Sequence, residues 1–142
     1  MTAPAPKQFA SAIIVDTQGR YLLQQRDNKH EIRFPGRIGL FGGHQENGET
    51  SLECVTREVH EEIGCYIPPA NFEYIATYCG LDASGTYMVE IFAAFEVDIA
   101  GFTITEGALL VVQPEGLFDL IDELTPSAAF AIETFIGQRD PS

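Results

Sequence analysis

The sequence predicts an α/β (α+β) domain in which a mixed β-sheet carries helices on its faces. Three observations support this class: a hairpin pattern near the N-terminus, helical patterns at residues 50–63 and 126–135, and strand patterns between them. Strands separated by helices in this way are typical of mixed sheets with helices packed on them. With 142 residues, the chain is long enough for one such domain and too short for two.

The first predicted elements are a short lead and a hairpin. Residues 1–7 are expected to form a flexible N-terminal lead, and residues 8–142 the single domain. Residues 9–15 are apolar and β-branched, residues 16–19 carry a turn signal, and residues 21–25 resume the extended pattern. This succession predicts two antiparallel strands.

A charged loop, a short strand and a helix follow. Residues 27–36 are charged and end in Phe-Pro-Gly, which favours a loop, and residues 38–41 predict a strand that leads into a pair of glycines. Residues 50–63 show the clearest helical period, with Gly64 in position to end the helix. The apolar residues expected to form its buried stripe are Leu52, Val55, Val59 and Ile63.

The second half of the chain predicts three strands and two helices. Residues 72–78 and 86–99 predict strands around a turn, and residues 108–112 predict another. Residues 114–120 predict a short helix, and Thr125 is the expected N-cap of the last helix. In the second of these strands the residues expected on one face are Tyr87, Val89, Ile91, Ala93, Phe95 and Val97.

Charge is distributed unevenly along the chain. The sequence holds 8 Lys and Arg against 21 Asp and Glu, a formal net charge of −13. Residues 1–57 hold 7 basic and 6 acidic side chains, whereas residues 58–142 hold 1 basic and 15 acidic ones. Because a nucleic-acid footprint needs clustered Lys and Arg, we expect no nucleic-acid polymer as a partner. An anionic small molecule still fits if metal ions bridge the repulsion.

Other features predict a cytoplasmic protein. Cys54, Cys65 and Cys79 show no metal-ligand spacing, and their odd number suits reduced thiols that pack as small core residues. No apolar run approaches the roughly 18 to 20 residues of a membrane span, and the N-terminus lacks the hydrophobic stretch of a signal peptide. We expect no membrane partner, and the sequence leaves a homodimer open.

Three glutamates share one face near the end of the predicted 50–63 helix. Glu58, Glu61 and Glu62 are spaced i, i+3 and i, i+4, where like charges destabilise a helix by about 0.2–0.5 kcal/mol per pair. The helix dipole also disfavours anions in the last turns. A solvated acidic face is the ordinary explanation of such a cluster. The functional explanation is a set of oxygen ligands for Mg²⁺ or Mn²⁺.

The residues around this cluster favour the functional explanation. Residues 43–65 read Gly-His-Gln-Glu-Asn-Gly-Glu-Thr-Ser-Leu-Glu-Cys-Val-Thr-Arg-Glu-Val-His-Glu-Glu-Ile-Gly-Cys. They resemble the Nudix box, G-x5-E-x7-R-E-U-x-E-E-x-G-U with U aliphatic, and depart from it at Cys65, a small apolar substitute. The resemblance implies an α/β/α sandwich with a mixed central sheet. The matching positions are Gly43, Glu49, Arg57, Glu58, Val59, Glu61, Glu62 and Gly64.

The resemblance implies a MutT-like hydrolase that cleaves the pyrophosphate bond of a nucleoside diphosphate linked to another group X. Glu58 and Glu62, with the Gly43 carbonyl, would hold a divalent ion that neutralises the diphosphate and activates water. Glu61 would bind a second ion or orient the water. The general base would be a box glutamate or Glu106 in a later loop, and Glu106 is explained equally well as a turn residue.

Two box residues are expected to have structural roles. In the family, the residues matching Glu49 and Arg57 brace the loop against the helix. The alternative is a surface pair between Arg57 and Glu53, one helical turn before it. Glycines at positions 42 and 43 would let the backbone approach a metal or phosphate closely.

Substrate contacts are less well defined by the sequence. By the resemblance, Arg26 at the end of the second strand would reach a phosphate, and His44 is a further candidate. Arg33 and Arg37 in the following loop are poorer candidates, since an exposed solubilising role explains each equally well. Three strand aromatics would either stack on a base or pack in the core, the commoner role: Tyr78, Tyr87 and Phe92.

Several subfamily markers are absent, which leaves a nucleoside triphosphate or nucleotide sugar as the default substrate. Position 80 is Gly where many ADP-ribose hydrolases have proline, and the proline-rich array of NADH hydrolases is missing. One alternative is a non-catalytic nucleotide-binding or sensor module, which predicts a decayed box. Another is a purely structural acidic helix, which would make the spacing of the box a coincidence.

Overall fold

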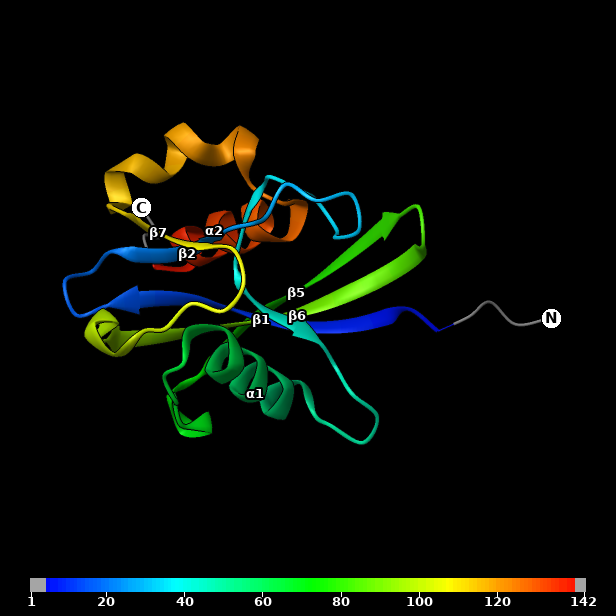
Figure 1. Ribbon diagram of the computed structural model, residues 1–142, viewed down its shortest axis with the longest axis horizontal. Helices are drawn as coiled ribbons and strands as arrows, with labels where there is room; N and C mark the ends of the chain where they lie inside the picture. The colour runs from blue at the N-terminus through cyan, green and yellow to red at the C-terminus, as the bar shows by residue number, and fades with distance from the viewer. Residues whose placement is uncertain (1–4, 140–142) are drawn as a thin grey trace.

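A mixed β-sheet runs through the middle of the molecule, with helix α1 on one face and helix α2 on the other (Figure 1). The computed structural model describes residues 5–139. The predicted α/β/α sandwich with a mixed central sheet is confirmed. In chain order the elements are β1 (Lys7–Asp16), β2 (Tyr21–Gln25), β3 (Ile38–Gly39), β4 (Phe41–His44), α1 (Ser51–Ile63), the 3-10 helix η1 (Pro69–Asn71), β5 (Glu73–Asp82), β6 (Gly85–Val97), η2 (Ile99–Gly101), β7 (Ala108–Val112), η3 (Pro114–Glu123) and α2 (Pro126–Arg139).

Strand β1 lies at the centre of the sheet. It pairs with β2 in the predicted antiparallel hairpin, with β6 in parallel, and with β4 near its own start. Strand β7 lies against β2, and β5 forms the far edge beyond β6. In this register Gly43 and Gly42 of β4 lie opposite Ala10 and Ser11. The glycine pair that opens the box is therefore held beside the middle of the sheet.

Each face of the sheet packs a separate hydrophobic core. Alternate side chains of β1 point to opposite faces, so one set packs under α1 and the other under α2 and η3. Val55, Val59 and Ile63 of the predicted stripe are fully buried against the sheet, and Leu52 is partly buried. Each such burial contributes about 1.5–3 kcal/mol. This packing fixes α1 and therefore the positions of its glutamates.

A buried carboxylate closes the β1–β2 hairpin. Asp16 accepts hydrogen bonds from the backbone N–H groups of Gln18 and Arg20 at 2.9 and 2.8 Å, and it pairs with the Arg20 side chain at 2.7 Å. Burial by itself would raise the pKa of Asp16, but these hydrogen bonds outweigh it and hold the pKa below its ordinary value. The turn signal at residues 16–19 therefore has a specific physical basis.

Replacing Asp16 with Ala is expected to destabilise the fold by about 1–3 kcal/mol near neutral pH, because the turn loses three hydrogen bonds to a buried carboxylate. Since the folded-state pKa is depressed, this contribution is present above the ordinary pKa of 3.8 and is lost as the pH falls through the folded-state value. Urea unfolding at neutral and acidic pH measures both effects. Asp27→Ala, at an exposed position, is the control and should change stability by less than about 0.5 kcal/mol. Equal losses in the two variants would contradict the assignment.

The predicted alternation of residues 86–99 is wrong at its C-terminal end. The set from Tyr87 to Ala93 packs on the α2 side, but Val97 packs on the α1 side. Glu96 has a left-handed backbone (φ 56°), and the register between β1 and β6 shifts at this point. The bulge switches the faces to which the following side chains point, so a sequence pattern with a strict period of two fails beyond it.

Several predicted element ends also differ. Strand β1 begins at Lys7, the last residue of the predicted lead, and residues 1–4 of that lead lie outside the described residues. The predicted 38–41 strand is two short strands interrupted at Leu40. The predicted 114–120 helix is a longer 3-10 helix. Within residues 5–139, no helix is long and apolar enough to cross a membrane.

The three cysteines do not all lie in the core. Cys54 of α1 is buried against the sheet and Cys65 is partly buried, but Cys79 is exposed on β5, which contradicts its predicted core position. Strand β5 is a sheet edge with alternately exposed side chains, and Cys79 falls on an exposed position.

Candidate functional site

Helix α1 begins and ends with strong local signals. Thr50 is the N-cap: its hydroxyl accepts from the Glu53 N–H at 3.1 Å, and the Glu53 carboxylate accepts from the Thr50 N–H at 2.9 Å. This capping box satisfies two otherwise unpaired donors. Gly64 ends the helix in the left-handed conformation (φ 70°) and donates to the His60 carbonyl. The helix is therefore fixed at both ends, and Glu53 is used in its cap.

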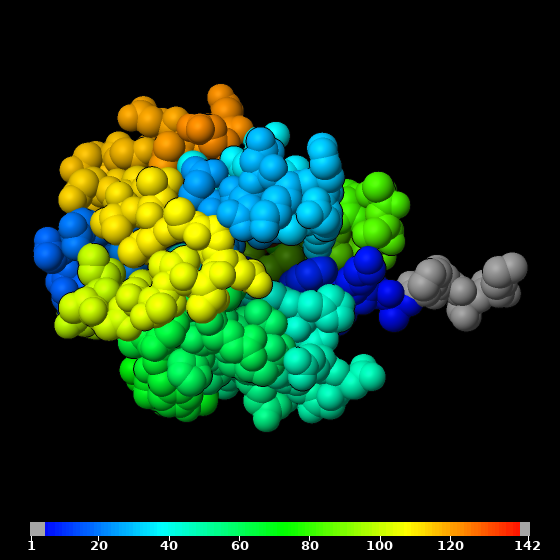
Figure 2. Space-filling model, in the orientation of Figure 1, coloured from blue at the N-terminus to red at the C-terminus, as the bar shows by residue number. Residues whose placement is uncertain are grey.

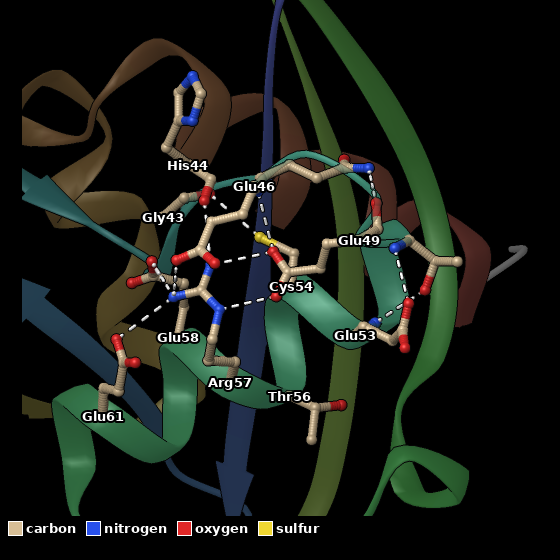
Figure 3. Close-up of polar contacts among 12 residues, drawn as sticks. Gly43, His44, Glu46, Glu49, Glu53, Cys54, Thr56, Arg57, Glu58 and Glu61 are labelled. Carbon is tan, nitrogen blue, oxygen red and sulfur yellow. Dashed lines mark hydrogen bonds and ion pairs between the residues drawn. The ribbon is translucent and has the colours of Figure 1, made fainter.

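Arg57 ties the preceding loop to the helix (Figure 3). Its guanidinium donates to both Glu49 oxygens, at 2.7 and 3.0 Å, and to the His44 carbonyl at 3.2 Å. The hydrogen bond from Arg57 lowers the pKa of Glu49 to about 2. The structure thus pairs Arg57 with Glu49 rather than with Glu53.

A cavity of about 270 Å³ opens beside this brace. Figure 2 shows the surface hollowed between the 27–36 loop, in light blue, and the start of β1, in dark blue. The cavity has acidic, basic and aromatic walls. Its lining includes Phe9, Ser11, Arg26, Arg33, Phe34, Gly42, Gly43, His44, Glu58, Glu62, Tyr87 and Glu106.

Glu62 is a buried carboxyl in the cavity wall. It is only 4% exposed and accepts a hydrogen bond from the Gly42 N–H at 2.7 Å. Gln24 of β2 donates to its other oxygen at 3.4 Å. Burial raises the pKa of Glu62 to about 8, and the nearby carboxylates of Glu106 and Glu58 act in the same direction. A cation beside this carboxyl group would stabilise its charged form and lower its pKa.

Glu58 lies one helical turn before it, against Gly43. A Cβ added to Gly43 would lie 2.4 Å from the Glu58 carboxyl carbon, so glycine leaves room for this carboxyl group in its present position. Burial raises the pKa of Glu58, although the Arg57 guanidinium, 2.9 Å away, opposes that effect. Glu58 and Glu62 therefore present two carboxyl groups to one cavity.

The other two predicted acidic residues are placed differently. The Glu61 side chain is 59% exposed, does not line the cavity, and faces Arg57 at 3.4 Å. Glu106 does line the cavity, from the loop before β7, and its backbone carbonyl accepts from Gln24 at 3.1 Å. The structure brings Glu58, Glu62 and Glu106 to one cavity and leaves Glu61 outside it.

These residues suit a divalent cation, although no three of them are gathered into a finished ligand group. Within residues 5–139, no set of three His, Cys, Asp or Glu side chains could hold an ion as they stand. Arg57 supplies the positive charge beside Glu58 and Glu61 instead. Two carboxyl groups with raised pKa values next to a glycine backbone form a donor set that Mg²⁺ or Mn²⁺ would stabilise.

The predicted basic contacts divide into two groups. Arg26 and His44 line the cavity, and burial lowers the pKa of Arg26. Arg26 also donates to the Arg33 carbonyl at 2.8 Å. Arg37 is turned away from the cavity and donates to the Asp122 carbonyl at 2.7 Å.

Of the three aromatic candidates, one reaches the cavity. Tyr87 is buried in the cavity wall. Phe92 packs in the core under α1, and Tyr78 packs against Tyr87 and Phe130. Phe92 and Tyr78 therefore pack in the hydrophobic core and do not line the cavity.

Two polar residues of the site were missed by the sequence reasoning. Ser11 lines the cavity from β1, and Gln24 joins β2 to Glu62 and Glu106. Both are buried polar residues in otherwise apolar strands. That exception to the apolar pattern was the signal available to find them.

Comparisons with known proteins agree with this arrangement. The NUDIX domain family matches residues 6–118. The NAD-capped RNA hydrolase NudC of Stutzerimonas stutzeri (strain A1501) is 30% identical over 144 residues, which cover 94% of this chain and 46% of that protein. The chain therefore spans less than half the length of this relative.

Solved structures show the same fold. The MutT protein from Methanosarcina mazei Go1 has a TM-score of 0.83 at 20% identity, covering 98% of this chain and 99% of that one. The MutT NUDIX hydrolase from Burkholderia pseudomallei has a TM-score of 0.73 at 22% identity, covering 92% of this chain and 98% of that one.

Proposed function

This chain belongs to the NUDIX domain family, and we propose from that premise that it is a divalent-metal-dependent hydrolase of a nucleoside diphosphate linked to X. The observation that carries the proposal is a pair of carboxyl groups, the buried Glu62 and the partly buried Glu58, which line one cavity with Arg26. The acidic side suits a cation and the basic side suits a phosphate. A nucleoside triphosphate or a nucleotide sugar is the proposed substrate.

Each residue of the cavity has a proposed role. Glu58 and Glu62, with the Gly43 carbonyl, would hold Mg²⁺ or Mn²⁺, and Glu61 would join them only by turning away from Arg57. A bound ion would neutralise the diphosphate and lower the pKa of the attacking water. Arg26 and His44 would contact phosphate oxygens, where the planar guanidinium is well suited to bind.

Glu106 is the proposed general base. Its side chain is exposed at the cavity, so it can accept a proton from water there. Glu62 is less suited, because its buried carboxyl group is proposed to hold the cation.

The proposed substrate is a free nucleotide rather than a capped RNA. The relative from Stutzerimonas stutzeri carries a name that refers to NAD-capped RNA, but this chain matches only 46% of that protein. The excess of acidic side chains in residues 58–142 would repel a polymer backbone. A free nucleotide is small, and the bound metal would neutralise its diphosphate, so the acidic side chains would repel it less than they would repel RNA.

The test is product release from a substrate panel with and without Mg²⁺ or Mn²⁺. The panel comprises nucleoside triphosphates, nucleotide sugars, ADP-ribose and dinucleoside polyphosphates. We expect metal-dependent formation of a nucleoside monophosphate from at least one class. Turnover that is independent of metal, or nucleotide binding without any turnover, would contradict the proposal, and the second result would indicate a sensor module.

Gly43→Ala is expected to lower Mn²⁺ affinity and turnover by about 10- to 100-fold while leaving the fold intact. The added Cβ would displace the Glu58 carboxyl group, the movable end of a flexible side chain, and the Gly43 backbone is not left-handed. Mn²⁺ titration followed by paramagnetic resonance, together with thermal unfolding, separates these effects. A variant with unchanged Mn²⁺ affinity would show that Glu58 is not a ligand.

A further inference from the structure

Arg33 is a positively charged residue of the cavity wall, which also holds Glu58, Glu62 and Glu106. We infer that Arg33 is a specificity-determining residue that recognises a carbonyl oxygen on the substrate base, so that the enzyme prefers keto bases to amino bases. This inference rests on the proposed nucleotide hydrolysis and names the substrate class within it.

Arg33 is held rigidly by contacts from three elements. Its guanidinium carbon lies 4.2 Å from the centre of the Tyr87 ring and 4.6 Å from that of Phe9. Those two rings are nearly perpendicular, at 87°, and form a corner around the guanidinium. Asp82, at the end of β5, accepts from Arg33 Nη2 at 2.6 Å. Contacts of this kind fix the plane of the guanidinium and the directions of its donors.

One donor of this fixed group has no partner. The Nε of Arg33 is buried and makes no hydrogen bond among the described residues. The same holds for one other buried side-chain atom in that part of the chain, Ser11 Oγ, and both residues line the cavity. Buried polar groups are nearly always paired, so two groups without a protein partner in one cavity favour a polar ligand there.

The charge around Arg33 favours a neutral acceptor over a phosphate. Hydrogen bonds from Ser84 lower the pKa of Asp82, and the charge of Arg33 adds to that effect, so the carboxylate stays ionised. This carboxylate already compensates the Arg33 charge and would repel a phosphate nearby. The Arg26 side chain makes one described hydrogen bond, to a backbone carbonyl, and is therefore better placed to meet the phosphate charge. A base carbonyl accepts a hydrogen bond without bringing a full negative charge.

The position of Arg33 along the sheet also suits a base. The two aromatic residues that hold Arg33 lie near the start of β1. Phe9 is the third residue of β1, and Tyr87 of β6 pairs with Lys7, the first residue of β1. Ser11 lies two residues further along β1, opposite Gly42, whose N–H meets Glu62. Two residues of a strand span about 7 Å. Arg33 is thus displaced along the cavity from the glutamates, on the side where the remainder of a metal-bound nucleotide would extend.

A guanidinium can only donate hydrogen bonds, so Arg33 can distinguish a base that accepts a hydrogen bond from one that donates it. Guanine, hypoxanthine and uracil carry a carbonyl oxygen where adenine and cytosine carry an amino group. An amino group facing Arg33 would set donor against donor. Arg33 therefore favours the keto member of each pair.

The experiment compares matched substrates. We expect kcat/KM to be about tenfold higher for ITP than for ATP and for UTP than for CTP, mostly through KM. In Arg33→Met, the values for ITP and UTP should fall toward those for ATP and CTP. Lys29→Met, an exposed charge in the same loop, is the control and should keep both ratios. If Arg33→Met does not fold, Arg33→Lys keeps the charge without the planar fork and should also lower the ratios.

The outcomes separate this inference from the proposed function. Metal-dependent turnover with keto-to-amino ratios near one, or with ratios that survive in Arg33→Met, would overturn the role of Arg33 and leave the hydrolase intact. Absence of turnover with every nucleotide in the panel would overturn the hydrolase, and this inference with it.

Discussion

Glu62→Gln is expected to lower kcat/KM by about 10³-fold or more under metal-saturating conditions. The substitution removes the buried one of the two carboxyl groups that would hold the cation, and a catalytic metal typically supplies several kcal/mol of transition-state stabilisation. The side chain keeps its shape and can still accept from the Gly42 N–H. Residual turnover within a few-fold of wild type would remove Glu62 from the proposed mechanism.

The same variant should be more stable than the wild type in metal-free buffer at alkaline pH. In the folded wild type Glu62 keeps its proton up to a pH of about 8, whereas the ordinary value is 4.5. Between these values the unfolded state binds fewer protons, so wild-type stability falls as the pH rises. Glutamine has no such cost. We expect its Tm to exceed that of wild type by a few degrees above about pH 8 and to match it near pH 5.

Thermal unfolding in the presence of a chelator therefore distinguishes a functional loss from misfolding. A stabilised but inactive variant is the expected combination, because the substitution removes both a proposed cation ligand and the cost of ionising a buried carboxyl group. A variant that is less stable than wild type at alkaline pH would show that the Glu62 carboxylate is well compensated without metal, contrary to its surroundings.

Gly42→Ala is expected to destabilise the fold by about 3–5 kcal/mol. A Cβ at this position would lie 2.2 Å from the Ala10 carbonyl oxygen and 2.5 Å from the Ser11 Cα, both on the central strand. The Gly42 backbone, at φ 154°, is also one that residues with side chains rarely adopt. Overpacking and backbone strain each cost about 1–3 kcal/mol, and a central strand cannot move away cheaply.

The matched control for this prediction is Gly101→Ala, where an added Cβ meets nothing within 4 Å and the backbone is not left-handed. Urea unfolding of the two variants should show a large loss for Gly42→Ala and a change below about 0.5 kcal/mol for Gly101→Ala. Similar small changes in both would mean that β4 is not pressed against β1 as described.

Much of the fold follows from local patterns in the sequence. The helical period, its capping residues and the glycine after it place α1 to within one residue, because each of these signals acts on neighbouring backbone groups. The strand alternation fails beyond Phe95, since the bulge at Glu96 depends on how β6 pairs with β1. Cys79 was placed wrongly for the same kind of reason, because the position of β5 at the sheet edge is a property of the whole topology.

The site could be predicted only in part. Glu58 and Glu62 are spaced i, i+4 on one helix and therefore lie side by side whatever the helix packs against. The sequence alone thus predicts that they share a site. The roles of Arg33 and Arg37 could not be separated, because the difference lies in distant partners: Asp82 for one and the Asp122 carbonyl for the other. Glu61 likewise shares the helix face with the other two but faces Arg57 from outside the cavity.

We propose above all that Glu58 and Glu62 hold a divalent cation in this cavity. The most direct measurement is anomalous X-ray diffraction from crystals soaked in Mn²⁺, with the metal located in a difference map. We expect a peak bound by both carboxylates at about 2.1–2.2 Å, with the Arg57 guanidinium displaced from Glu58. Crystals that turn over substrate in Mn²⁺ but show no metal at these two carboxylates would contradict the account.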